Sequence, residues 1–357
     1  MKKTGAKAGK WLSAAVIALV LLLGIAGLII SLLNRQSNDT YSPDLEGYEG
    51  SQFASMGNGF AALSEISVRL FDADGSTIST LARSYPAGML ACSKNAAVVW
   101  SEGGTALSIL HSDGRSRDLT FAEGVTAADV NDNGYAVVLA GEKGYKGYVD
   151  VIRPDGTEAY RVFAASAYPL DVDISPDSKH IAILSLTADG SRLSVYEMTS
   201  ETPVFEWEDA GLYFDLEYLP GGRIFLISAE KAVFLNSSGS VVGEYSFGGD
   251  YLQDYSIGTS GVALALGQYQ SGAAIRIVTL NNDAAEIASR KAEDEVNALS
   301  AAGNQIAVLG RDDIRLFDWS LNERLSLSSA AGVQAVMMRA DGSAILISGG
   351  GAAIIEP

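Results

Sequence analysis

The sequence predicts an all-β protein, an eight-bladed β-propeller preceded by one N-terminal transmembrane helix, and three observations support this prediction. First, short apolar or alternating runs recur along the chain and end in Asp, Gly, Ser, Pro or Asn, as strands joined by tight turns do. Second, groups of four such runs repeat at roughly forty-residue spacing, which is the period of a four-stranded blade. Third, residues 11–33 form one uncharged apolar run.

The apolar run begins at Trp11, ends at Leu33 and predicts an anchor in the membrane. At about 1.5 Å rise per residue, a helix of this length crosses a hydrocarbon core of about 30 Å. A cleaved signal peptide is the alternative, but its apolar region usually has about 7–15 residues and ends at small residues in alternate positions. Residues 1–10 form a basic tail, and acidic residues follow the run. The positive-inside rule therefore predicts a cytoplasmic N-terminus and a propeller outside the cytoplasm.

Composition limits the class of partner. The 357 residues include 43 Asp and Glu but only 25 Lys and Arg, which gives a net charge of −18. A surface this acidic repels nucleic acid, so a charged partner is expected to be a basic protein or a metal ion. The single cysteine, Cys92, excludes an internal disulfide, and its apolar surroundings are typical of a buried, inert thiol.

The domain organisation follows from the repeat. Residues 34–50 are polar and form a linker, and residues 51–357 contain seven complete four-strand units and a last unit of three strands. An unpaired edge is unstable, so we expect the linker around Tyr41 to Tyr48 to supply a fourth strand and close an eight-bladed ring. Seven blades is the alternative, if the first unit and the C-terminal piece share a blade. In each unit the second strand is the most continuously apolar, which predicts burial on both faces.

Two segments resemble known propellers. ISPDSKHIAIL, residues 174–184, resembles the Ser-Pro-Asp turn and following strand of TolB-like and WD-repeat propellers, and DDIRLFDWSLN, residues 312–322, is similar to their third strand. The resemblance implies the propeller fold; because no Gly-His and Trp-Asp pair recurs in every unit, it implies no activity. The order of basic tail, anchor and propeller also resembles uncharacterised bacterial membrane-anchored propellers of unknown function.

Motifs of catalytic or nucleotide-binding sites are missing from the sequence. It contains no nucleophile elbow, P-loop or dinucleotide fingerprint, and neither His111 nor His180 has metal-ligating neighbours at the usual spacing. Residues 129–134 (DVNDNG) begin like a calcium loop, but Ala140 stands where an EF-hand needs Glu, and the same residues suit a tight turn. We therefore predict no catalytic residue, no metal ligand and no resident cofactor, with calcium left open as an alternative.

One pattern of polar residues recurs in five successive units. When the units are aligned by the turn after the first strand, each has an acidic or amide residue near the start of that strand: Asp171, Asp215, Asp254, Asn297 and Gln334. First strands line the central channel of a propeller, so these side chains would form a ring at one mouth of the channel. Such a ring would suit a cation or a basic peptide; the simpler interpretation is that polar side chains face channel water.

The function predicted from the sequence is protein or ligand binding, or scaffolding, by a non-catalytic propeller at the cell envelope. Its partners would be the membrane, through residues 11–33, and another protein. The alternative is a metal-dependent hydrolase whose metal is held by Asp171, Asp215 and Asp254. These two hypotheses differ in whether the three carboxylates bind a divalent ion.

Overall fold

The computed structural model describes residues 41–357 apart from residues 49, 87, 271, 329 and 350. Residues Pro43–Pro357 form one compact unit of the chain. Within this unit the described residues form thirty β-strands and no α-helix. The all-β class predicted from the sequence is therefore confirmed for the described part of the chain.

The predicted N-terminal segments cannot be compared with this structure. The basic tail, residues 1–10, and the anchor, residues 11–33, lie outside the described residues. Within the described part, no helix is long and apolar enough to span a bilayer. The anchor thus stays a prediction from the sequence.

The strands form seven antiparallel sheets in which strands adjacent in sequence are hydrogen-bonded to one another. Five of these sheets have four strands, one has seven and one has three. The first three sheets consist of β1 (Gln52–Met56), β2 (Gly59–Leu63), β3 (Ser67–Phe71), β4 (Thr77–Ala82); β5 (Met89–Cys92), β6 (Ala96–Trp100), β7 (Ala106–His111), β8 (Ser116–Thr120); and β9 (Val125–Val130), β10 (Ala136–Ala140), β11 (Gly147–Ile152), β12 (Glu158–Ala164).

The next two sheets consist of β13 (Tyr168–Ile174), β14 (His180–Leu186), β15 (Ser191–Glu197), β16 (Pro203–Asp209); and β17 (Tyr213–Leu219), β18 (Arg223–Ser228), β19 (Lys231–Leu235), β20 (Val241–Ser246). The seven-stranded sheet consists of β21 (Tyr251–Gly258), β22 (Gly261–Gly267), β23 (Ala274–Asn281), β24 (Glu286–Ala302), β25 (Gln305–Gly310), β26 (Ile314–Asp318) and β27 (Glu323–Leu327). The last sheet consists of β28 (Val333–Met338), β29 (Ala344–Ser348) and β30 (Gly351–Ile355).

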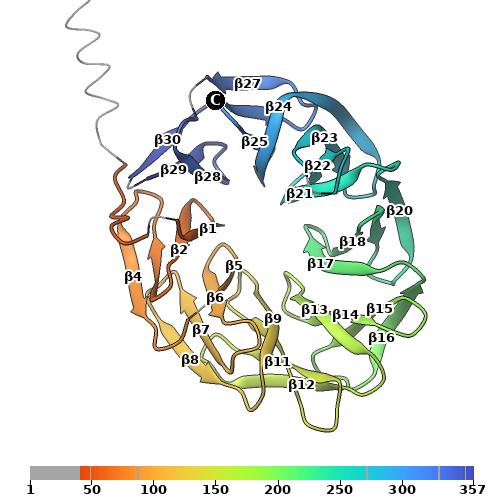
Figure 1. The fold of residues 1–357 in the computed structure, drawn as a ribbon. Coiled ribbons are helices and arrows are strands. Elements are labelled where there is room, and N and C mark those ends of the chain that lie inside the picture. Colours follow the sequence, from red (N-terminus) through yellow and green to blue (C-terminus); the bar gives the residue numbers. More distant parts are fainter. Residues whose placement is uncertain (1–40, 49, 87, 271, 329, 350) are drawn as a thin grey trace, which may run out of the picture. The chain divides into compact units, whose positions relative to one another are not determined.

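Within the Pro43–Pro357 unit the sheets follow one another around a ring, with the first strand of each sheet nearest the centre (Figure 1). This is the arrangement of a β-propeller. Because consecutive strands are antiparallel, every first strand begins on one face of the ring, and the turns between second and third strands lie on that face as well. We call it the linker face, because the chain reaches β1 there. The other face, which carries the turns after first and third strands, is the distal face.

Hydrogen bonds between neighbouring sheets agree with this assignment of faces. On the linker face, Gln52 at the start of β1 donates to the carbonyl of Gly88, just before β5 (2.7 Å). On the distal face, Asn133 in the turn after β9 donates to the carbonyl of Pro176 in the turn after β13 (3.0 Å). Contacts on each face therefore join equivalent turns of successive sheets.

The ring closes where β1 meets β28, and it does so without the expected extra strand. The Ser55 hydroxyl of β1 donates to the carbonyl of Met338 in β28 (3.4 Å), and the last sheet keeps three strands. Residues 41–48 form no strand. Instead, Tyr48 is buried and its hydroxyl pairs with that of Ser67 in β3 (2.7 Å), so this segment packs on the first sheet rather than completing the last one.

The core lies between sheets, and the second strand of each sheet supplies most of it. In β18, Phe225 and Ile227 belong to a cluster shared with β22 of the following sheet, whereas Ile224 and Leu226 pack with β14 of the preceding sheet. Side chains alternate between the two faces of a strand, so the apolar residues of one second strand pack against both the preceding and the following sheet. The predicted burial of the second strands is confirmed.

Candidate functional site

The structure first locates the predicted acidic column. Asp171, Asp215 and Asp254 lie at equivalent positions near the starts of β13, β17 and β21, and each binds the next first strand along the ring. An Asp171 carboxylate oxygen accepts a hydrogen bond from the backbone N–H of Leu216 (2.9 Å), and Asp254 accepts one from the N–H of Leu299 (2.7 Å). Asp215 accepts from a tyrosine hydroxyl of β21 (2.7 Å). These carboxylates therefore hold neighbouring first strands together.

Asn297 and Gln334 do not belong to the same column. In each of these five strands the pairing register shifts by one residue: near the start of β13, β17, β21 and β28, and in β24 at the start of the part that pairs with β25. The residues skipped are Leu170, Phe214, Gln253, Asn297 and Gln334. The two amides thus occupy the bulged position, one residue before the position of the three aspartates. Both are exposed; Asn297 donates to the carbonyl of Gly310 (3.0 Å). A β-bulge moves a side chain off the regular alternation, and turn-based alignment cannot detect it.

Five carboxyl groups gather instead on three neighbouring first strands. We call them the carboxyl cluster: Asp129 on β9, Asp171 and Asp173 on β13, and Asp215 and Glu217 on β17. Asp173 is only 5% exposed and accepts a hydrogen bond from the next strand, as Asp171 does. Asp129 is hydrogen-bonded to Asp173, and Asp171 to Asp215.

The electrostatics of the carboxyl cluster follow from burial and mutual repulsion. Burial, followed by the charges of Glu217 and Asp171, raises the pKa of Asp129 to about 7. Burial also raises the pKa of Asp173, and the charge of Asp129 is the next cause. Burial followed by the charge of Asp215 raises the pKa of Asp171, and burial followed by the charge of Asp173 raises the pKa of Glu217. Two carboxyl groups in hydrogen-bonding contact share a proton more readily than they carry two charges.

Positive charge is missing from the surroundings of the carboxyl cluster. Within the described part of the chain, no Lys or Arg forms an ion pair with any of its five members. No group of three or more His, Cys, Asp or Glu in the described ranges is arranged to hold a metal ion. The cluster is therefore a set of proton-sharing, strand-bridging side chains, and the arrangement gives the predicted metal-dependent hydrolase no support.

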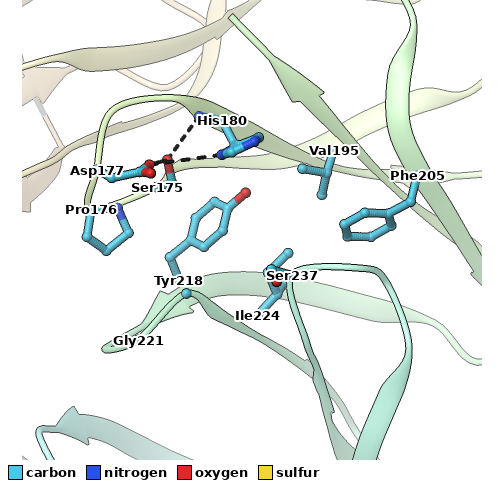
Figure 2. Close-up of a pocket in the computed structure, with 11 residues that line it drawn as sticks. Ser175, Pro176, Asp177, His180, Val195, Phe205, Tyr218, Gly221, Ile224 and Ser237 are labelled. Carbon is cyan, nitrogen blue, oxygen red and sulfur yellow. Dashed lines mark hydrogen bonds and ion pairs between the residues drawn. The ribbon is translucent and has the colours of Figure 1, made fainter.

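A pocket of about 380 Å³ lies elsewhere, between the β13–β16 sheet and the β17–β20 sheet. Turns of the distal face surround it, and apolar side chains form its walls (Figure 2). Its lining consists of Ser175, Pro176, Asp177, His180, Val195, Phe205, Tyr218, Gly221, Gly222, Ile224 and Ser237. A concave, mostly apolar site with a few polar groups is typical of ligand recognition.

The turn between β17 and β18 shapes one side of the pocket. In it, Gly222 donates its N–H to the carbonyl of Leu219 (3.1 Å), and Pro220 and Gly221 are the central residues. Gly221 has a φ of 86°, which only glycine adopts without strain at the third position of a type II turn after proline. This Pro-Gly turn keeps side chains away from the mouth of the pocket.

Tyr218 is the polar residue at the floor of the pocket. Its ring lines the pocket, and its hydroxyl points toward His180 and Val195 (Figure 2). The hydroxyl oxygen is buried and has no hydrogen-bond partner among the described residues. A bound group that hydrogen-bonds this oxygen would relieve the penalty of burying it.

Ser175, Asp177 and His180 at the rim do not form a catalytic triad. The Ser175 hydroxyl donates to the Asp177 carboxylate (2.7 Å) and accepts from the backbone N–H of His180 (3.0 Å). The His180 imidazole has its Nδ1 atom 4.0 Å from Asp177 and makes no hydrogen bond to the serine. A nucleophilic serine needs a base that takes its proton, so this arrangement closes the Ser-Pro-Asp turn rather than activating a hydroxyl.

Sequence reasoning missed the pocket and most of the carboxyl cluster. The signal for the cluster was present, since DVD at residues 171–173 and DLE at residues 215–217 place two acids on the same side of each strand. The pocket had no such signal, because its lining residues come from two sheets and are separated by up to 62 positions, from Ser175 to Ser237.

Comparison with solved structures supports the fold. The C-terminal WD40 domain of Sif2 matches with a TM-score of 0.61 and 14% identity, over 85% of this chain and 93% of that one. BamB from Moraxella catarrhalis matches with a TM-score of 0.55 and 14% identity, over 88% and 96%. The propeller domain of Cps50 (Swd1) from Myceliophteria thermophila matches with a TM-score of 0.52 and 10% identity, over 73% and 92%.

The predicted resemblance to WD-repeat propellers is thus confirmed at the level of the fold. None of the curated proteins matches the chain. A family model described as "Family of unknown function (DUF5711)" matches residues 37–356, which is most of the sequence. The chain therefore belongs to the DUF5711 family, and its fold is that of a β-propeller.

Proposed function

We propose that this protein is a non-catalytic binding or scaffolding propeller outside the cytoplasm, held in the cell membrane by residues 11–33. The observation that carries the binding role is the pocket of about 380 Å³ on the distal face, with its apolar walls and the buried Tyr218 hydroxyl. Loops placed on a rigid scaffold suit the recognition of another protein. The net charge of −18 favours a partner with basic groups.

The positions of the linker and the pocket agree with this role. Residues 43–51 reach the propeller on the linker face, whereas the turns around the pocket lie on the distal face. A tether that ends on one face leaves the turns of the other face free for a partner.

We also propose that the ring has eight blades. The first part of β24 pairs with β23, from Glu286 to Lys291, and its second part pairs with β25, from Val296 to Ala302. Counted this way, β21–β24 and β24–β27 are two four-stranded blades that share one long strand. Between the two parts the chain stays extended, where the other sheets are separated by a break.

The first prediction concerns the topology. With Cys92 replaced by alanine, a Val204→Cys variant is expected to react with a membrane-impermeant maleimide on intact cells, because Val204 is 54% exposed on the distal face and the propeller is proposed to lie outside. A Lys7→Cys variant in the same background is the matched control and should react only after lysis. Labelling of the tail but not of the propeller in intact cells would contradict the proposed orientation.

The second prediction concerns the binding face. A photoreactive amino acid at Ser237, an exposed residue at the pocket, is expected to give one discrete cross-linked product in cells of the native source. The same residue placed at Ile66 on the linker face, where exposure is also high, serves as the control. The binding role of the pocket fails if Ser237 gives no product, or if both positions give the same product.

A further inference from the structure

Exposed hydrophobic side chains are distributed unequally between the two faces of the ring. The described residues include fourteen large hydrophobic side chains that are exposed. Three of them, Val204, Val241 and Ile287, lie near the distal ends of their strands, and the remaining eleven lie on the linker face. Random placement would divide them about evenly, so the linker face has a distinct surface chemistry.

Six of these eleven side chains are concentrated on consecutive sheets. We call them the aromatic arc: Tyr168, Leu170, Leu212, Phe214, Tyr251 and Tyr269. They lie at or before the starts of β13, β17 and β21 and in the turn after β22. Leu170 and Phe214 occupy the bulged positions of their strands, and Leu212 and Phe214 are 64% and 52% exposed. A bulge changes the direction of the side chain at the extra residue, and at these two bulges the extra residue is apolar and exposed to solvent.

Several charged side chains next to the aromatic arc are paired, and the exposed Asp189 and Glu230 lie on the same face, in the β14–β15 and β18–β19 turns. Asp209, just before Leu212, is paired with Lys231 (3.3 Å), and Asp250, just before Tyr251, is paired with Arg276 (2.6 Å). Lys146 donates to the hydroxyl of Tyr168 (2.6 Å). Charged and paired groups bordering tyrosine and leucine side chains form an amphipathic surface, and its exposed carboxylates disfavour anionic headgroups.

We propose that the aromatic arc rests on the membrane surface, with its side chains in the interfacial region of the bilayer. This inference rests on the proposed membrane anchor. Residues 34–42 join the apolar run to Pro43 and, as nine residues, span at most about 30 Å. The chain then reaches the propeller on the same face as the arc. Aromatic side chains concentrate at membrane interfaces, where an apolar ring and a polar tip both find suitable surroundings.

A second protein is the alternative to the membrane as the partner that covers the aromatic arc. The binding of the arc to lipid alone distinguishes these two partners. The net charge of −18 disfavours anionic headgroups, so the arc is expected to bind zwitterionic lipid at least as well as anionic lipid. A protein partner would leave the arc in water when only lipid is present. Vesicles of pure phosphatidylcholine are therefore the discriminating probe.

The test uses the full-length chain with Cys92 replaced by alanine, reconstituted into phosphatidylcholine vesicles that contain a headgroup-proximal spin-labelled lipid. An environment-sensitive fluorophore on Leu212→Cys is expected to lose emission through quenching by the labelled lipid. The matched control is Val204→Cys, near the start of β16, the strand that precedes Leu212; its side chain is 54% exposed on the distal face. Its emission should not change.

Each result decides the inference. Quenching at position 212 but not at 204 supports the membrane contact. Equal quenching at both positions, or none at 212 in a chain that floats with the vesicles, overturns the contact while leaving the anchor intact. A chain that does not float with the vesicles contradicts the anchor itself, and with it this inference.

Discussion

Replacing Asp129 by asparagine is expected to raise the free energy of unfolding by about 2–4 kcal/mol at pH 8, by less at pH 5 and by almost nothing near pH 3. The pKa of Asp129 is about 7 in the folded protein, against an ordinary value of 3.8. At pH 8 the folded state therefore carries an unfavourable charge that the unfolded chain tolerates. Asparagine removes this charge, and its side-chain oxygen can still accept the hydrogen bond that protonated Asp173 donates.

The sign of the pH dependence follows from the direction of the shift. Because the folded pKa lies above the unfolded value, the folded state holds the proton more tightly. The contribution of Asp129 to stability is therefore full below about pH 4 and falls as the pH rises toward 7. The raised pKa values of Asp171, Asp173 and Glu217 act in the same direction.

Urea denaturation of the full-length chain from pH 3 to pH 8 measures this effect. Asp74→Asn is the matched control, since it makes the same change of charge at an exposed turn and should give no comparable gain. A gain from Asp129→Asn that does not vary with pH would show that repulsion within the carboxyl cluster is not the cause. A loss of stability at pH 8 would show that the ionised side chain has a favourable partner.

Replacing Phe225 by alanine is expected to lower the free energy of unfolding by about 3–5 kcal/mol. Phe225 is fully buried in the cluster between two successive sheets. Its ring centroid lies 5.2 Å from that of Phe234 in its own sheet and 5.4 Å from that of Tyr255 in the next one. The substitution removes contacts on both sides of an interface and leaves a cavity that rigid strands fill poorly.

Phe214→Ala is the matched control for this prediction, because Phe214 is 52% exposed on the linker face. We expect its effect on unfolding to stay within about 0.5 kcal/mol. Thermal or urea unfolding of the two variants provides the comparison. Equal effects would mean that packing between sheets does not dominate the stability of the ring.

The sequence predicted the strands well because their signals are local. Alternating and apolar runs, and turn residues such as those of residues 174–184, depend on backbone geometry within a few positions. The repeat of separate four-strand units does not predict a strand that belongs to two of them, as the long strand β24 does. Pairing with β23 on one side and β25 on the other keeps it continuous, and partners of this kind are not visible in a local pattern.

Alignment of the units by their turns placed three of the five predicted residues at one structural position and missed the position of the other two. Asp171, Asp215 and Asp254 share a position, but Asn297 and Gln334 fall one residue earlier, at the bulge. A bulge is decided by how a first strand fits its neighbours in the ring, so alignment by turns could not detect it.

By itself the sequence determined the strand content, the burial of second strands, the acidic charge and the apolar run of residues 11–33, because each depends on residue type and spacing. Only the tertiary structure decided which carboxyl groups meet, which turns enclose the pocket and which face carries the aromatic arc. These features join residues of separate sheets. Their positions depend on the curvature and closure of the ring, and closure is a property of all the sheets together.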